Sequence, residues 1–191
     1  MVFRILADPG LDVILSRIDH DLADKARSAG CPCGGALHSA RYPRKPRCGK
    51  DLGSDWRWRL SFCCAAEGCR SRVTPASVRF LGRRVYPAVL VILVCALAQG
   101  LTCRRRAILR RAIGVDRSTL ERWQRWWRDS FPSTRLWRAA SARFLPPVDT
   151  AALPLSLVSR FGRWCVEAIV RILRFLSPLS GPASVSSCRL R

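Results

Sequence analysis

Hydrophobic residues recur at helical spacing in several segments of this chain, and polar or glycine-rich stretches separate them. The first segment predicts an N-terminal helix over residues 10–28, one face of which carries Leu11, Ile14, Ile18 and Leu22. A second segment, 88–98, is apolar on every side and follows a proline, which suits the first position of a helix. It is shorter than the roughly 20 residues that cross a bilayer. We therefore expect a buried helix there, with an interfacial membrane segment as the alternative.

The C-terminal part of the chain has the same helical spacing. It predicts helices over 153–161 and 164–176, and the second has an apolar stripe of Val166, Ile169, Val170 and Leu173. A further short helix is expected around Trp137 and Phe144. The residues from Pro178 onward are rich in Ser, Pro and Gly, so we expect a disordered tail.

Two of the predicted helices are separated by a glycine turn. The first is expected to pack through Ile108, Leu109, Ala112 and Ile113 and to stop at Gly114, because glycine adopts the left-handed conformation at little cost. Val115 is then an apolar anchor between the two helices. Asp116 or Ser118 can cap the second helix, and Ser118 with Glu121 fits a capping box.

The second helix has an apolar face and a basic face. Leu120, Trp123 and Trp127 fall on the first, and polar residues rich in arginine fall on the other. This pattern predicts a helix-turn-helix whose second helix enters the DNA major groove. Expected base-edge contacts are Arg117, Ser118, Glu121, Arg122 and Arg125, with Arg104, Arg105, Arg106 and Arg128 near phosphates. The alternative is an ordinary amphipathic pair with a solvated arginine face.

Four of the ten cysteines have spacing typical of a metal site. Cys31 and Cys33 form one pair before two glycines, and Cys64 and Cys69 form the second pair around a turn. Two such pairs predict a zinc ribbon with four thiolate ligands, so structural zinc is the expected cofactor. His38 or Cys48 could replace one thiolate. The alternative is a set of buried or free cysteines without metal.

Alternation along residues 57–64 helps to select the ligand in the second pair. Trp58, Leu60, Phe62 and Cys64 fall on one side of a predicted strand, while Cys63 falls on the arginine side. Cys64 is therefore expected to point inward. The remaining cysteines have no ligand spacing, so we interpret Cys95, Cys103 and Cys165 as packing residues and Cys188 as a thiol in the tail.

The charge of the chain points to a polyanionic partner. Lys and Arg number 34 against 13 Asp and Glu, for a formal net charge of +21. Double-stranded DNA is the leading partner for such a surface, and an anionic membrane is the rival. GC-rich coding also favours arginine, which lessens the weight of arginine enrichment. The N-terminus carries no recognisable signal peptide, so a cytoplasmic, nucleoid-associated protein is expected, without a membrane partner or a small-molecule substrate.

These patterns together predict a mainly α fold with a small β zinc ribbon. We expect an N-terminal helix in 1–29, the ribbon in 30–85, the helix-turn-helix unit in 86–132, further helices in 133–177 and the tail in 178–191.

The motifs follow one another in a recognisable order: the Cys31 and Cys33 knuckle, then 42–47, 64–70, 75–86 and 114–123. In this order the chain resembles, over residues 10–178, a family of bacterial zinc-ribbon plus helix-turn-helix proteins associated with transposable elements. The resemblance implies DNA binding for an insertion sequence or transposase-like system. The chain departs from the pattern in the short Cys31–Cys33 spacing and in Cys48.

Three other functions are weighed against a sequence-specific DNA-binding protein. Metal-dependent DNA cleavage needs clustered carboxylates, which this sequence lacks, so we expect no enzyme and regard a transposase or nuclease as less favoured. A scaffold that holds a separate transposase, or self-association, would use exposed apolar helix faces. A degraded copy would bind nucleic acid non-specifically.

Overall fold

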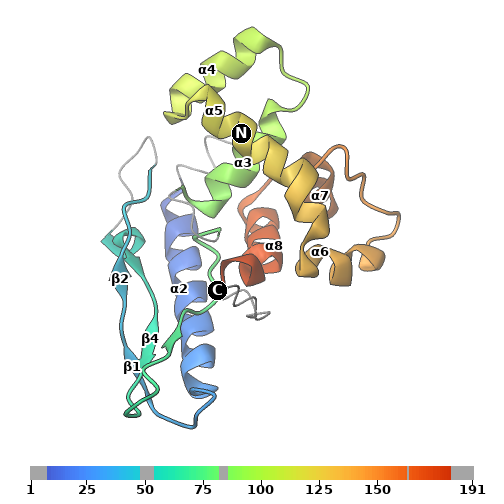
Figure 1. The fold of residues 1–191 in the computed structure, drawn as a ribbon. Helices are drawn as coiled ribbons and strands as arrows, with labels where there is room; N and C mark the ends of the chain where they lie inside the picture. The colour runs from blue at the N-terminus through green and yellow to red at the C-terminus, as the bar shows by residue number, and fades with distance from the viewer. Residues whose placement is uncertain (1–7, 48–53, 82–85, 163, 182–191) are drawn as a thin grey trace, which may run out of the picture.

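The computed structural model describes residues 8–47, 54–81, 86–162 and 164–181, and it is mainly helical with a small antiparallel sheet (Figure 1). The longer helices are α2 (Pro9–Ser28), α3 (Ala88–Ala98), α4 (Cys103–Ile113), α5 (Arg117–Arg125) and α8 (Val166–Leu176). Shorter ones are α6 (Arg135–Ala140) and α7 (Leu155–Arg160). A π-helical turn, η2 (Trp126–Ser130), extends α5, and 3-10 turns occur at η1 (Ser54–Arg57), η3 (Phe131–Ser133), η4 (Ser141–Arg143) and η5 (Ser177–Ser180).

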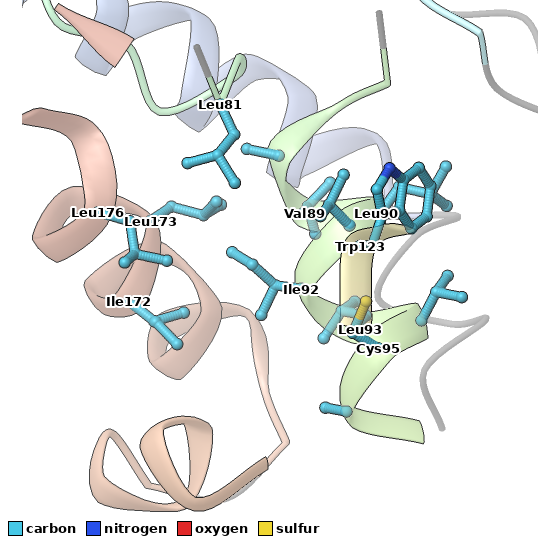
Figure 2. Packing of buried hydrophobic residues seen from close by; sticks show 14 of the residues in the cluster. Leu81, Val89, Leu90, Ile92, Leu93, Cys95, Trp123, Ile172, Leu173 and Leu176 are labelled. Carbon is cyan, nitrogen blue, oxygen red and sulfur yellow. The ribbon is translucent and has the colours of Figure 1, made fainter. Parts of the chain in front are cut away.

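Helix α3 lies at the centre of the main core. Its side chains from Ala88 to Ala96 are buried, and α3 contacts α4, α5, α7 and α8. In Figure 2, Val89, Ile92 and Leu93 of α3 lie between the apolar residues of α8 and Trp123 of α5. A helix surrounded on all sides by other elements has no polar face, which explains its all-round apolar sequence. The prediction of a buried helix is confirmed. Within the described residues, no helix is both long and apolar enough to cross a membrane.

Helix α2 is rotated relative to the face predicted from its sequence. Leu11, Leu15 and Ile18 are buried, but Ile14 is 41% exposed, so the buried face of the helix differs from the predicted apolar face. The buried face also contains Asp19, whose carboxylate accepts hydrogen bonds from Arg79 and Ser77. Directing this carboxylate inward turns Ile14 toward solvent. The side chain of Asp8 caps the helix by accepting a bond from the Gly10 N–H.

The strands form a long hairpin that runs beside α2 (Figure 1). One sheet has the antiparallel order β1 (Leu37–Ser39), β4 (Phe62–Cys64), β5 (Arg72–Val73). Farther along, β2 (Tyr42–Pro43) pairs with β3 (Trp58–Arg59). A second small core lies between this sheet and the end of α2, and consists of Ala23, Cys31, Leu37, Phe62 and Cys64.

The alternation predicted over residues 57–64 holds in β4 and fails in β3. Phe62 and Cys64 are buried in β4, and Cys63 is half-buried. In β3, Arg59 is buried and Trp58 is 39% exposed, opposite to expectation. The strand breaks at Leu60 and Ser61, which reverses the inward side. Arg59 is held inside because its guanidinium donates to the carbonyl oxygens of Pro75 and Ser180.

The C-terminal segment is ordered farther than predicted. Ser180 in η5 is buried and donates a hydrogen bond to the Ser77 carbonyl oxygen at 3.0 Å. The expected disorder from Pro178 is therefore wrong for 178–181, while 182–191, including Cys188, lie outside the described residues. In the predicted stripe of α8, Ile169 and Leu173 are buried, and Val166 and Val170 are half-buried.

The three cysteines that were expected to pack inside the protein differ in their exposure. Cys95 is buried in α3, as predicted, but Cys103 and Cys165 are exposed. Both exposed residues lie at the beginning of a helix: Cys103 opens α4, and Cys165 precedes α8. The packing prediction was therefore wrong for both.

Candidate metal centre and nucleic-acid interface

Cys31, Cys33, Cys64 and Cys69 converge, with all four sulfur atoms within 4.8 Å of one another. Cys31 and Cys33 follow α2, Cys64 ends β4, and Cys69 lies in the loop before β5. The Sγ atoms of Cys31 and Cys69 are 3.7 Å apart, and those of Cys33 and Cys64 are 3.4 Å apart. The predicted convergence of the two pairs is confirmed.

The spacing of these sulfurs fits a four-coordinate metal ion. A tetrahedron with Zn–S bonds of about 2.3 Å has sulfur–sulfur edges of about 3.8 Å. The observed 3.7 Å and 3.4 Å separations lie close to that edge. The sulfurs of Cys31 and Cys33 also lie within 4.8 Å of each other, so the single residue between them does not prevent both from approaching one ion, and the four thiols are compatible with a metal site.

The loops that present the cysteines depend on glycine. Gly34 and Gly68 have φ values of 80° and 82°, in the left-handed region that favours glycine. At Gly35 the restriction is space, because a Cβ would lie 2.6 Å from Cys64 Sγ and 2.8 Å from the Ala66 Cβ. The Ala66 N–H points at Cys64 Sγ, 3.4 Å away. The glycine turns thus allow the cysteine sulfurs and a backbone N–H donor to lie close together.

Hydrogen bonds and burial give the cysteines of the cluster different pKa values. Hydrogen bonds from the side chain and backbone of Ser71 lower the pKa of Cys69 to about 6, because they stabilise its thiolate. The backbone N–H of Ala66 also lowers the pKa of Cys64, but burial and hydrogen bonds with the neighbouring sulfurs raise it to about 12. Zinc binds cysteine as thiolate, so occupancy of this cluster would release protons.

Of the two alternative ligands, His38 is the one that the structure describes, and it does not join the four-sulfur cluster. His38 lies on β1, where it is exposed and paired in register with Cys63. Cys63 is half-buried, and its Sγ contacts the carbonyl oxygen of Arg70 rather than the four sulfurs. Cys48 lies outside the described residues.

The turn between α4 and α5 follows the sequence prediction closely. Gly114 ends α4 with φ 69° and ψ 34°, and its N–H bonds back to the carbonyls of Arg110 and Arg111. Val115 is buried between the helices, as expected. Leu109 and Ile113 pack inward, but Ile108 is 59% exposed and Ala112 is exposed, so the predicted face was too wide. A helix at the surface buries only a stripe.

Asp116, rather than Ser118, caps α5. The Asp116 carboxylate accepts bonds from the Ser118 hydroxyl and from the backbone N–H and hydroxyl of Thr119. These three bonds lower the pKa of Asp116 to about 2. The predicted capping box is wrong, because Ser118 bonds to Asp116 and Glu121 pairs with Arg117 at 2.6 Å.

Helix α5 presents one buried and one exposed face. Leu120, Trp123 and Trp127 are buried, and the ring of Trp123 packs against Tyr86 with centroids 4.8 Å apart. The opposite face is exposed and contains the predicted base-contacting residues Arg117, Ser118, Glu121, Arg122 and Arg125. The side chain of Arg122 donates to the Thr119 hydroxyl at 3.2 Å. The distribution of residues between the two faces matches the prediction.

The arginines expected near phosphates differ in their exposure. Arg104, Arg105 and Arg128 are exposed, and Arg128 pairs with the neighbouring Asp129 at 2.8 Å. Arg106 is half-buried: one guanidinium nitrogen donates to the Leu101 carbonyl oxygen at 3.4 Å, and its buried Nε has no partner within the described ranges.

A pocket lies between α4 and α5, and Arg106 lines it. Arg110, Arg117 and Glu121 also line it. Arg110 was absent from the sequence prediction. Its position one turn after Arg106 is the signal that could have identified it, because residues at i and i+4 share a helix face. Arg110 therefore joins Arg106 and Arg117 as the third arginine that lines this pocket.

Comparisons with protein-family models, with curated proteins and with solved structures give no match for this chain.

Proposed function

We propose that this protein binds double-stranded DNA in a sequence-specific manner, with α4 and α5 as a helix-turn-helix. The observation that carries the proposal is the two-sided character of α5. Its apolar face is anchored in the core by Leu120 and Trp123, while its exposed face carries Arg122 and Arg125. A helix fixed in this way can present its side chains to the major groove without losing its own packing.

The exposed residues of α5 suit the reading of bases. Arg122 and Arg125 can bond bidentately to guanine, and Glu121 can accept a bond from the amino group of cytosine. Arg117 and Ser118 lie at the start of the helix, the end that enters the groove first. The Arg117–Glu121 pair orients both side chains along that edge.

Phosphates are the proposed partners of the arginines around the pair. Arg104 and Arg105 begin α4, Arg106 lines the pocket, and Arg128 follows α5. Contacts with the DNA backbone position the protein and make its affinity depend on salt, without selecting a sequence.

We further propose that the four cysteines hold one zinc ion with a structural role. The sulfur spacing supports tetrahedral ligation, and the ion would join the start of the hairpin to its β4–β5 turn. Cys31, Cys33, Cys64 and Cys69 would supply all four ligands, which leaves no open position for substrate.

We also propose that the protein binds DNA for a mobile element, and this proposal rests on the family resemblance of the sequence. It predicts that the preferred DNA site matches repeats flanking the gene. Selection of bound duplexes from a random pool, followed by comparison with that flanking DNA, tests it. A site unrelated to the flanks would contradict the mobile-element role and leave DNA binding intact.

The test of sequence reading compares single arginine variants on the selected site and on scrambled DNA. Arg122→Ala or Arg125→Ala should lower the discrimination between the two by about 1–3 kcal/mol, because a bidentate base contact is lost. Arg105→Ala should weaken binding to both and reduce the salt slope by about 1. Arg138→Ala, an exposed position on α6, is the matched control. Unchanged discrimination in both α5 variants would overturn the proposal.

A further inference from the structure

A second basic surface lies on the hairpin, away from α4 and α5 in the sequence. We call it the hairpin arginine surface and define it by Arg41, Arg44, Arg57 and Arg72 with the rings of Tyr42 and Trp58. Its strands are joined by the Tyr42–Arg59 and Pro43–Trp58 register and by a 2.6 Å bond from the Arg44 N–H to the Arg57 carbonyl oxygen. The helix-turn-helix proposal does not use these residues.

Three of these arginines place the guanidinium carbon over an aromatic ring. The Arg41 Cζ lies 5.0 Å from the centroid of Trp58, and the Cζ atoms of Arg72 and Arg44 lie 5.6 Å and 6.0 Å from Tyr42. A cation–π contact of this kind restrains a guanidinium while its N–H groups stay available to acceptors. The arginines are therefore oriented before any ligand arrives, which lowers the entropy cost of binding.

The surface is strongly and locally basic. Basic residues of segments 37–47 and 54–73 are Arg41, Arg44, Lys45, Arg47, Arg57, Arg59, Arg70 and Arg72, whereas the acidic ones are Asp55 and Glu67. Asp55 already accepts a bond from Ser16 at 2.7 Å. None of the ion pairs within the described ranges involves Arg41, Arg57 or Arg72. These exposed charges thus lack a carboxylate partner there and attract anions.

We infer that the hairpin arginine surface is a second contact with the phosphate backbone of double-stranded DNA. The partner rests on the proposed function, but the contact is separate from base reading by α5. Planar guanidinium groups match phosphate oxygens bidentately. In Figure 1 the β2 end of the hairpin lies toward the end of the molecule that carries α4 and α5. A duplex bound at α5 would therefore have a second basic surface toward the same end of the molecule.

The small apolar area of the hairpin arginine surface argues against a membrane as its partner. Trp58 is its large exposed hydrophobic residue, and Arg41 covers the ring. Interfacial insertion needs a continuous apolar face, with aromatic or leucine side chains free to enter the bilayer. A sheet with arginines over its aromatic rings instead offers donors at fixed positions, as a phosphate backbone requires.

The experiment measures DNA affinity against salt concentration for the double variant Arg41→Ala/Arg72→Ala. We expect affinity for the selected and the scrambled duplex to fall equally, by about tenfold or more at 0.1 M salt, with the salt slope reduced by about 2. The Arg138→Ala/Arg171→Ala variant removes two exposed arginines from α6 and α8 and should change the affinity and the slope much less. Zinc content and circular dichroism confirm that each variant is folded.

The outcomes separate this inference from the proposed function. Unchanged affinity and slope in the hairpin variant would overturn the inference, while discrimination by α5 would still stand. Loss of binding in a protein that never discriminated between duplexes would support the hairpin contact and contradict base reading. A selective loss of RNA or vesicle binding, with DNA binding unchanged, would also overturn the inference, because the surface would then serve a different partner.

Discussion

The Asp19 carboxylate accepts three hydrogen bonds inside the protein. Its donors are Arg79 Nε at 2.8 Å, the Ser77 hydroxyl at 2.6 Å and the Val78 N–H at 2.7 Å. The side chains of Asp19 and Arg79 are 0% and 2% exposed. A buried pair of this kind joins α2 to the chain before α3. It is stable only while both charges and their donors are present.

Asp19→Ala should therefore destabilise the protein strongly. Removal of the carboxylate leaves the Arg79 guanidinium buried without its counter-charge, at a cost of about 3–5 kcal/mol in the free energy of unfolding. Chemical denaturation followed by circular dichroism measures the change. Asp24→Ala, on the exposed side of the same helix, is the control and should shift stability by less than about 0.5 kcal/mol. Equal midpoints for the two variants would contradict a structural role for the pair.

At the scale of elements, short turns decide where functional side chains lie. Gly114 and Asp116 end one helix and begin the next, and this orients the exposed face of α5. Gly34, Gly35 and Gly68 do the same for the cysteine loops. In each turn a glycine is required either by a positive φ or by the lack of room for a Cβ.

Gly35→Ala should weaken metal binding by the cysteine cluster. The added Cβ would lie within 2.6 Å of Cys64 Sγ, so the sulfur must move from its position. We expect zinc affinity to fall at least about tenfold, comparable with the loss of a supporting group around a metal site. Competition against a chromophoric chelator measures it. Gly30→Ala, where φ is 73° but no atom lies within 4 Å of the Cβ, controls for backbone strain alone. A similar affinity for both variants would show that the clash is relieved elsewhere.

At the scale of the whole molecule, the protein has two hydrophobic cores. The larger one surrounds α3, and the smaller one contains Cys31 and Cys64 with three apolar neighbours. Figure 1 places the cysteine loops at the end of the hairpin opposite to α4 and α5. A core as small as the second one would gain stability from a cross-link such as the proposed zinc ion.

If the proposed zinc ion is bound, its chelation should unfold the hairpin before the helices. In hydrogen exchange followed by mass spectrometry, amides in 31–40 and 60–73 should lose protection, while those in α3 and α8 keep theirs. The reason is that α3 packs against α5, α7 and α8 without the cysteines. Cys69→Ser should give the same pattern without chelator. Simultaneous loss of protection throughout the chain would mean that the cores fold as one unit, and no change would argue against a structural metal.

Local signals in the sequence determined much of this protein. Gly114, a cap at Asp116 or Ser118 and the apolar spacing of Leu120 and Trp123 predicted the helix pair and its exposed face. The paired spacing of the cysteines predicted which four sulfurs meet. The signals for the helix pair act through hydrogen bonds within one or two turns. The signal for the cysteines acts because a metal site needs a full set of ligands.

Only the tertiary structure decided which positions of each helix and strand are buried and which are exposed. Asp19 and Arg79, Arg59, Ile14 and Ile108 all differ from what helix or strand spacing predicts. The reason is that a charge can be buried only when its partner is brought to it, and the partner of Asp19 is 60 residues away. The partner of Arg59 at Ser180 is 121 residues away. Periodicity gives the faces of an element, but the contacts between distant segments select which face turns inward.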